Sequence, residues 1–177
     1  MKELLPEHFE PLATQEEISR RLAEIGREIS SFYSDRDLTV VAIANGGILF
    51  AADLVRAIDL PLKLDVIAVS SYRQDRAGDQ MVLRAEPKLD PAGADILLVD
   101  EVLDTGRTLL RLIDYFRNRG AASVRTAVAV DKKRERPDGL AKADWTCFSL
   151  PDRYLVGYGL DSCELYRNLP VIGAIGK

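Results

Sequence analysis

The sequence has few of the residues that several classes of protein depend on. Its 177 residues include two cysteines and one histidine. Cys147 and Cys163 are too few for a disulfide framework or a cysteine-rich metal site, which favours a reducing compartment such as the cytoplasm. His8 is the lone histidine and has no nucleophile near it in the sequence, so a Ser-His or Cys-His mechanism is not expected.

Long apolar runs and an excess of positive charge are also missing. No run approaches the roughly 18 apolar residues of a transmembrane helix, and the N-terminus lacks the apolar region of a signal peptide. The formal net charge is −4, which argues against a broad nucleic-acid-binding surface. Apolar residues make up 47% of the chain, as in an ordinary globular protein. We therefore expect one domain, residues 1–177, with no membrane or nucleic-acid partner.

Apolar periodicity predicts strands that alternate with helices. Helical spacing is seen at residues 14–33, where Thr14 and Glu17 match a capping box, and again after residues 47 and 108. Strand patterns occupy residues 38–44, 62–72, 81–84, 96–99, 123–131 and 144–150. This alternation predicts an α/β fold with a mainly parallel sheet.

The stretch from residue 96 to 109 is the most informative part of the chain. A buried strand, Ile96–Val99, is followed at once by Asp100 and Glu101, then by Asp-Thr-Gly-Arg-Thr at residues 104–108, and then by a helix. The free N–H groups of a helix N-terminus form a ready phosphate site. Carboxylates next to that site are useful if they hold sugar hydroxyls or Mg²⁺. The combination indicates a phosphorylated sugar as the ligand.

Two other strands should end close to this stretch. Asn45, Gly46 and Gly47 follow the strand 38–44, and two glycines allow a backbone to approach an anion closely, although Asn-Gly-Gly is also an ordinary turn. The strand 123–131 is followed by Lys132. Ligands of open parallel sheets bind beyond the carboxyl ends of the strands, so these segments should converge on one crevice.

Residues 96–108 resemble the signature of the type I phosphoribosyltransferases: an apolar strand, two acids, two apolar residues and Asp-Thr-Gly-x-Thr. Residues 151–161 are similar to the 6-oxopurine group of that family: Pro-Asp, two residues, an apolar pair, Gly-Tyr-Gly, an apolar residue and Asp. The resemblance extends over about residues 10–175. It implies the type I phosphoribosyltransferase fold, with a mainly parallel twisted sheet, a flexible lid loop at about 71–84, and a small hood built from the N-terminal segment and about 145–177.

The resemblance also implies an activity. A hypoxanthine-guanine phosphoribosyltransferase transfers the 5-phosphoribosyl group of phosphoribosyl pyrophosphate (PRPP) to N9 of hypoxanthine or guanine, with Mg²⁺ as cofactor. The products are IMP or GMP and pyrophosphate, and the pathway is purine salvage. A preference for xanthine stays open, as does a non-catalytic regulator that senses PRPP or a nucleotide on the same fold. A homodimer or homotetramer in the cytoplasm is expected.

For the PRPP half of the site, the resemblance assigns Asp100 and Glu101 to the ribose hydroxyls and, together with Asp161, to the metal. Asp104 is the expected general base, close to N7 of the purine. The 5′-phosphate would bind Asp104, Thr105, Gly106, Arg107 and Thr108, and the pyrophosphate would bind Asn45, Gly46, Gly47 and Arg167. The family often has a cis peptide in this pyrophosphate loop, which falls at Ala44-Asn45. Many relatives have Glu-Asp where this chain has Asp-Glu.

For the purine half, the resemblance implies stacking on Tyr154, a main-chain contact at Leu155 and a nearby carboxylate at Asp161. Either Lys132 or Lys133 would donate to O6 of the base; Lys132 matches by following Asp131, and Lys133 by its spacing to the later aromatic segment. The lid would contribute Ser71 and Tyr72, which close over the site and exclude water during chemistry.

Overall fold

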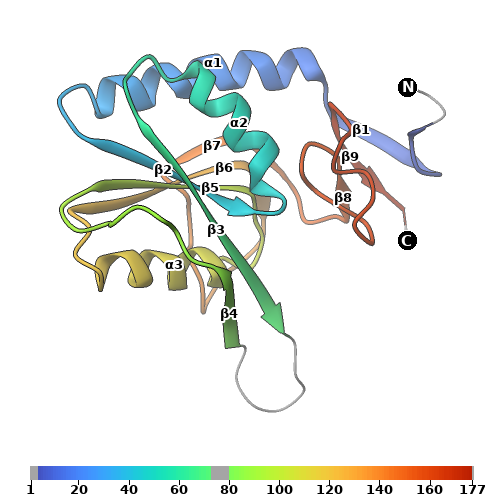
Figure 1. Cartoon of the computed structure of the whole chain (residues 1–177). Coiled ribbons are helices and arrows are strands. Elements are labelled where there is room, and N and C mark those ends of the chain that lie inside the picture. The colour runs from blue at the N-terminus through green and yellow to red at the C-terminus, as the bar shows by residue number, and fades with distance from the viewer. Residues whose placement is uncertain (1–3, 73–79, 177) are drawn as a thin grey trace.

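Two sheets and three helices make up the computed structural model, which describes residues 4–72 and 80–176. The elements follow in the order β1 (Phe9–Ala13), α1 (Gln15–Phe32), β2 (Leu38–Ala44), α2 (Gly47–Ala57), β3 (Lys63–Tyr72), β4 (Gln80–Ala85), β5 (Asp95–Leu103), α3 (Arg107–Arg117), β6 (Ser123–Lys133), β7 (Trp145–Pro151), β8 (Leu155–Val156) and β9 (Ile172–Ile175). The main sheet has the order β4-β3-β2-β5-β6-β7 (Figure 1).

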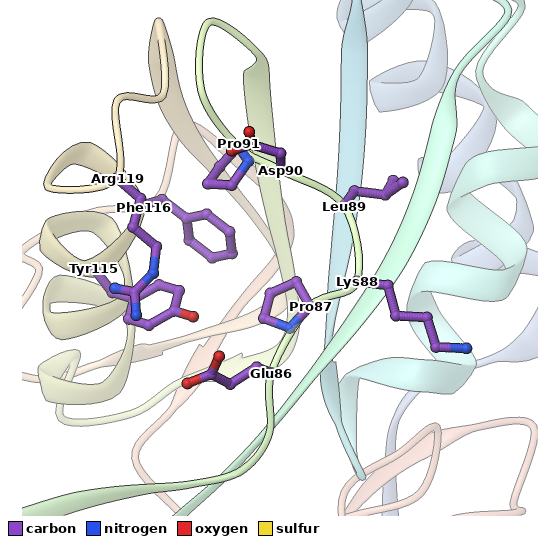
Figure 2. A pocket seen from close by; sticks show the side chains of 9 residues that line it. All are labelled: Glu86, Pro87, Lys88, Leu89, Asp90, Pro91, Tyr115, Phe116 and Arg119. Atoms are coloured by element: carbon purple, nitrogen blue, oxygen red, sulfur yellow. The ribbon is translucent and has the colours of Figure 1, made fainter.

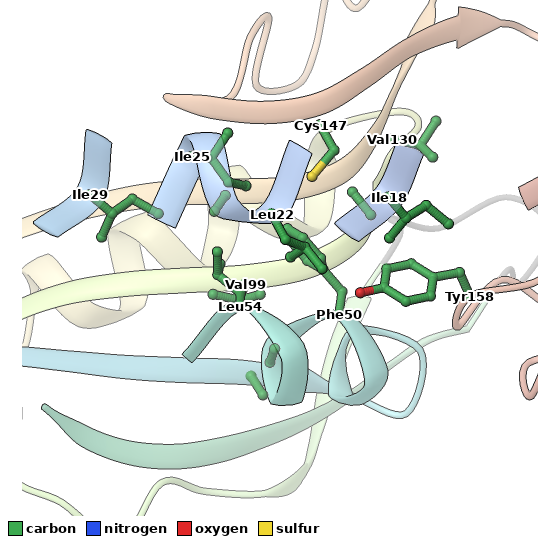
Figure 3. Close-up of a cluster of buried hydrophobic side chains, with 14 of the residues drawn as sticks. Ile18, Leu22, Ile25, Ile29, Phe50, Leu54, Val99, Val130, Cys147 and Tyr158 are labelled. Carbon is green, nitrogen blue, oxygen red and sulfur yellow. The ribbon is translucent and has the colours of Figure 1, made fainter. Parts of the chain in front are cut away.

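The main sheet is parallel from β3 to β7, and β4 is its antiparallel edge strand. Helices α1 and α2 cover one face and α3 covers the other (Figure 1). On the first face, one side of α1 packs against α2 and the sheet (Figure 3), with Ile18, Leu22, Ile25, Ile29, Phe50, Leu54 and Val99 in the core. Both faces of the central strands are therefore buried, which explains their nearly continuous apolar sequences.

The predicted α/β class is confirmed, and so are the strand at 38–44 and the capping box of α1. The main chain of Thr14 donates to Glu17 Oε2 at 2.8 Å, and Glu17 N donates to Thr14 Oγ1 at 3.2 Å. Strands β5 and β6 are longer than predicted. Their ladder continues through Leu103 and Asp131, so Asp100, Glu101, Lys132 and Lys133 belong to strands and do not follow them.

A small second sheet, in the order β1-β9-β8, lies at one end of the main sheet (Figure 1). The sequence patterns did not predict these strands, because β8 has two residues and β1 contains a proline. Residues 145–151, where the hood was expected to begin, form β7, which pairs with β6 in the main sheet, and the hood stays a prediction. The second sheet takes its C-terminal strands only from residues after Pro151.

The expected lid falls partly outside the described residues. Ser71 and Tyr72 end β3, and β4 begins at Gln80, so the returning strand is confirmed close to the predicted residues 81–84. Residues 73–79 lie in the part that is not described, and the lid stays a prediction. Both cysteines are free. Within the described residues, no helix is long and apolar enough to cross a membrane.

Candidate active site

A cavity of about 340 Å³ opens at the carboxyl ends of the central strands. Strands β2, β3 and β5, the start of α3 and the segment before β9 all contribute to its wall. The predicted site residues that line it are Asn45, Gly46, Asp100, Glu101, Thr108, Asp161 and Arg167. Residues from four separate segments of the sequence therefore meet at one edge of the sheet, as expected for a doubly wound fold.

The loop between β2 and α2 comes very close to the acid pair. The peptide bond Ala44-Asn45 is cis, at the position that the family resemblance implied. A Cβ atom on Gly46 would overlap the Glu101 carboxylate, and one on Gly47 would crowd the main chain of β5. Helix α2 begins here without a side-chain cap, so its first-turn N–H groups are available to an anion, except that of Ile48, which donates to Asn45 O at 3.3 Å.

The acid pair has no cationic side chain bound to it among the described residues. Asp100 is buried, and burial, followed by the repulsion of Glu101, raises the pKa of the Asp100 carboxyl well above its ordinary value. Among the described residues no cation forms an ion pair with either acid. Hard oxygen ligands in a site short of positive charge suit Mg²⁺, so Asp100 and Glu101 fit the expected cofactor chemically.

The three predicted metal ligands do not form one preformed site. Asp161 is turned toward the C-terminal segment, where its Oδ1 lies 2.9 Å from Arg167 Nη2 and its Oδ2 accepts from Glu164 N at 2.9 Å. Over the described ranges, no three His, Cys, Asp or Glu side chains are grouped closely enough to hold a metal ion. A metal would therefore need oxygen ligands from a substrate or from water in addition to Asp100 and Glu101.

The loop from residue 104 to 108 is shaped by a left-handed glycine. Gly106 has φ +73°, and its carbonyl accepts from Leu110 N at 3.0 Å and Leu140 N at 3.1 Å. Helix α3 starts at the next residue without a side-chain cap. Thr108 lines the cavity, whereas Thr105 and Arg107 are exposed, and Arg107 reaches Asp138 at 3.4 Å.

Beside this loop, two carboxylates and two cations form a compact cluster. Lys132 Nζ lies 3.2 Å from Asp104 Oδ2 and 3.7 Å from Asp152 Oδ1. Arg134 Nη1 lies 2.7 Å from Asp104 Oδ1 and 3.4 Å from Asp152 Oδ2. The Lys132 side chain is 13% exposed, whereas Lys133 is exposed at the end of β6. The structure thus places Lys132 next to Asp104 and leaves Lys133 outside the cluster.

The C-terminal segment supplies the remaining predicted residues. Tyr154 is exposed, and its carbonyl accepts from Ile175 N at 3.0 Å, while Leu155 is buried and pairs with Ala174. Arg167 Nη1 donates to Gly159 O at 2.7 Å. Its Nε is buried and has no hydrogen-bond partner among the residues that the structure describes, which leaves one donor beside the cavity.

Sequence reasoning missed three residues of this region. Arg134 and Asp152 complete the charge cluster, and the side chain of Arg136 is only 4% exposed although it ends a run of charged residues. A Lys-Lys-Arg-Glu-Arg segment predicts a solvated loop, because nothing in its pattern indicates which cation turns inward. The Pro-Asp of the second motif was the one available signal for Asp152.

A second hollow, of about 400 Å³, lies between the β4–β5 connection and the end of α3 (Figure 2). The guanidinium of Arg119 stacks over the Tyr115 ring at 3.6 Å from its centroid. This hollow lies at the amino edge of β5, away from the strand ends that carry the acids. Its wall contains none of the predicted site residues.

Comparison with known proteins shows which family the chain belongs to. The phosphoribosyl transferase domain family matches residues 10–162. The hypoxanthine-guanine phosphoribosyltransferase of Bacillus subtilis is 39% identical over 170 residues, which cover 93% of this chain and 91% of that protein. The enzyme of the same name from Streptococcus pneumoniae is 38% identical over 165 residues, with the same coverage. The hypoxanthine phosphoribosyltransferase of Trypanosoma cruzi, solved with the product IMP, superposes with a TM-score of 0.89 at 30% identity and covers 97% of both chains.

Proposed function

Because the chain belongs to the phosphoribosyltransferase family, we propose that it transfers the 5-phosphoribosyl group of PRPP to N9 of hypoxanthine or guanine. IMP or GMP and pyrophosphate are the products, as in purine salvage. The observation that carries the proposal is the meeting of three features at one sheet edge: the Asn45–Gly47 loop, the acid pair of β5, and Lys132 beside Asp104. The two bacterial relatives reported above carry the name of this enzyme, and their similarity extends over 93% of this chain.

The cavity is the proposed PRPP site. The uncapped start of α3 and the hydroxyl of Thr108 would hold the 5′-phosphate, and the Asn45–Gly47 loop with Arg167 would hold the pyrophosphate. Asp100 and Glu101 would hold the ribose hydroxyls and Mg²⁺. Magnesium, when bound with PRPP, supplies positive charge that neutralises the pyrophosphate leaving group.

The charge cluster is the proposed purine site. Lys132 would donate to O6 of the base, Tyr154 would stack on its face, and the main chain at Leu155 would contact its amino edge. As the bond from N9 to C1′ forms, the bond from C1′ to the pyrophosphate oxygen breaks. Asp104 would accept the proton that N7 loses. Lys132 and Arg134, which hold the Asp104 carboxylate, must then give way in part to the base.

The test is nucleotide formation from PRPP and Mg²⁺ with hypoxanthine, guanine, xanthine and adenine in parallel. We expect turnover with hypoxanthine or guanine, none with adenine, and loss of turnover when a chelator removes the metal. Faster turnover with xanthine would change the assigned base. Tight PRPP binding without turnover on any base would contradict the enzyme and favour a regulator.

We further propose a homodimer or homotetramer, supported by large exposed apolar side chains on neighbouring strands. Leu64 and Val66 are two residues apart on β3 and point to the same face of the sheet. Val82 is on β4, where it pairs with Ser70 of β3. Such a patch on a soluble chain is typical of an interface. Sedimentation of the Leu64→Lys variant should show a smaller particle than the wild type, whereas Leu165→Lys, an exposed site near the second sheet, should not. The cytoplasmic location stays a prediction.

A further inference from the structure

Arg136 lies in the connection after β6, yet its side chain is only 4% exposed. Its guanidinium donates to main-chain carbonyls at the ends of two strands. Nη2 lies 2.7 Å from Leu103 O and also donates to Lys132 O, while Nε donates to Asp104 O. One side chain therefore joins the end of β5 to the end of β6 at the point where the two strands enter the active site.

Two further contacts fix the guanidinium itself. Nη2 lies 2.7 Å from Asp131 Oδ1, and Nη1 donates to Ala141 O at 3.2 Å. The Asp131 carboxylate balances the buried charge, which would otherwise be costly in this position. The Ala141 contact extends the network to the segment at residues 139–141, on which Gly106 packs through Leu140.

This arrangement needs the planar fork of arginine. A guanidinium has five N–H donors in fixed directions and serves several acceptors in one plane, whereas a lysine ammonium is a compact point charge with three donors. The acceptors come from the end of β5, the end of β6 and, at Ala141, the segment before β7. A lysine in this position could keep the charge balance with Asp131 but would leave carbonyls unpaired.

We propose that Arg136 is a positioning residue, which sets the distance between Asp104 and Lys132 by binding the main-chain carbonyls of both. The inference rests on the proposed phosphoribosyl transfer, in which Asp104 takes a proton from the base and Lys132 contacts its O6. Both side chains must meet one planar purine, so a shift between the two strand ends misplaces one group relative to the other. Arg136 contacts no part of the cavity and acts through these two residues.

Arg134 provides an instructive contrast. It also binds Asp104, but through the carboxylate, and its own side chain is 37% exposed. Water or substrate can replace that contact. Arg136 instead binds main-chain carbonyls, those of Leu103, Asp104 and Lys132, and its own side chain is only 4% exposed, so the geometry of the two strand ends depends on Arg136.

The test compares Arg136→Lys with Arg125→Lys. Arg125 lies on β6, and its Nη1 forms an ion pair with Asp144 at 2.6 Å, but its side chain is 46% exposed and it is distant from the catalytic loop. For each variant, kcat and KM for hypoxanthine are measured together with the thermal midpoint. A purely structural role lowers the amount of folded enzyme and leaves KM unchanged, because KM does not depend on enzyme concentration.

We expect Arg136→Lys to lower kcat/KM for hypoxanthine about 10²-fold, with a raised KM, since small misplacements of reacting groups have effects of this size. Arg125→Lys should keep both constants. Unchanged constants in a folded Arg136→Lys enzyme would overturn the positioning role while the wild-type turnover stands. Absence of wild-type turnover would remove the proposed function and this inference with it.

If Arg136→Lys does not fold, the Asp131→Asn variant tests the positioning role of Arg136 instead. This variant keeps the guanidinium and removes the carboxylate that fixes it at 2.7 Å. A raised KM for hypoxanthine in Asp131→Asn supports the inference, and an unchanged KM and kcat contradict it.

Discussion

Two groups of carboxylates lie at the same edge of the sheet, and they are neutralised in opposite ways. Asp100 and Glu101 have no cation partner among the described residues, and burial with mutual repulsion raises the pKa of Asp100. Asp104 and Asp152 both form ion pairs with Lys132 and Arg134, with N···O distances of 2.7–3.7 Å. The first group lacks a positive partner, whereas the second is paired with two cationic side chains of the protein.

The difference matches what each half of the site is proposed to bind. A polyanionic substrate that carries Mg²⁺ brings the positive charge that the first group lacks. A neutral purine brings none, so the protein must supply the donor, and the cluster holds Lys132 and Arg134 ready for that purpose. The first half therefore costs stability until its ligand binds, whereas the second half is balanced in the free protein.

Removing the charge of Asp104 is expected to have the largest effect. Asp104→Asn should lower kcat about 10²- to 10⁴-fold, because a general base contributes that much. PRPP binding should stay close to wild type, since the loop donors are main-chain N–H groups. Steady-state kinetics and PRPP calorimetry measure the two quantities separately. An equal loss of PRPP affinity and turnover would show that the two halves of the site are not independent.

Lys132 and Lys133 give the next largest difference. Lys132→Ala should raise KM for hypoxanthine about 10- to 100-fold, the value of a hydrogen bond to a charged group. Lys133→Ala is the matched control, because the neighbouring side chain is exposed and forms no contact with Asp104. KM for PRPP should change little in both variants. A larger effect of Lys133→Ala would move the O6 contact by one residue.

Gly46→Ala tests the half of the site that contains Asp100 and Glu101. Its Cβ would overlap the Glu101 carboxylate, which is the end of a flexible side chain and can rotate away at little cost to stability. We expect KM for PRPP to rise about tenfold, equivalent to ~1.4 kcal/mol, with KM for hypoxanthine unchanged. Gly93→Ala is the control: Gly93 has φ +73° and open space around its Cβ, so that variant should lose stability and keep both KM values.

Much of the fold and of the candidate site could be predicted from the sequence, because these features depend on local sequence patterns. The apolar run and the Asp-Thr-Gly-Arg-Thr loop specify β5, the phosphate loop and the start of α3. The capping residues Thr14 and Glu17 mark the start of α1. These features depend on neighbours within a few positions, so a single sequence contains them.

The features that were missed depend on distant partners. Asp100 and Glu101 look like residues that leave the sheet, and the ladder to β6 keeps them in it. The sequence around Arg136 suggests a solvated side chain, but its guanidinium donates hydrogen bonds to four main-chain carbonyls from three segments. Strands β1, β8 and β9 are too short to show a period, and their pairing joins the two ends of the chain.

The smallest effect is expected for Asp100→Asn. Whereas the variants above lower activity, this one should raise the stability of the ligand-free protein. Because the pKa of Asp100 is raised on folding, the folded chain retains a proton that the unfolded chain loses. Stability is therefore lost as the pH rises from the ordinary carboxyl pKa of about 4 through the raised value. Asparagine removes this loss at neutral pH.

We expect Asp100→Asn to gain on the order of 1 kcal/mol at pH 7, which raises Tm by roughly 2–4 °C. The gain should shrink toward pH 4, where the wild-type carboxyl is protonated. Calorimetric melting across this pH range measures it, with Asp90→Asn, at an exposed carboxylate in the β4–β5 connection, as the control. With PRPP and Mg²⁺ present the order should reverse, because the ligands stabilise the wild type more than the variant. A variant that is less stable at every pH, with and without ligands, would show that the charge of Asp100 is already balanced in the free protein.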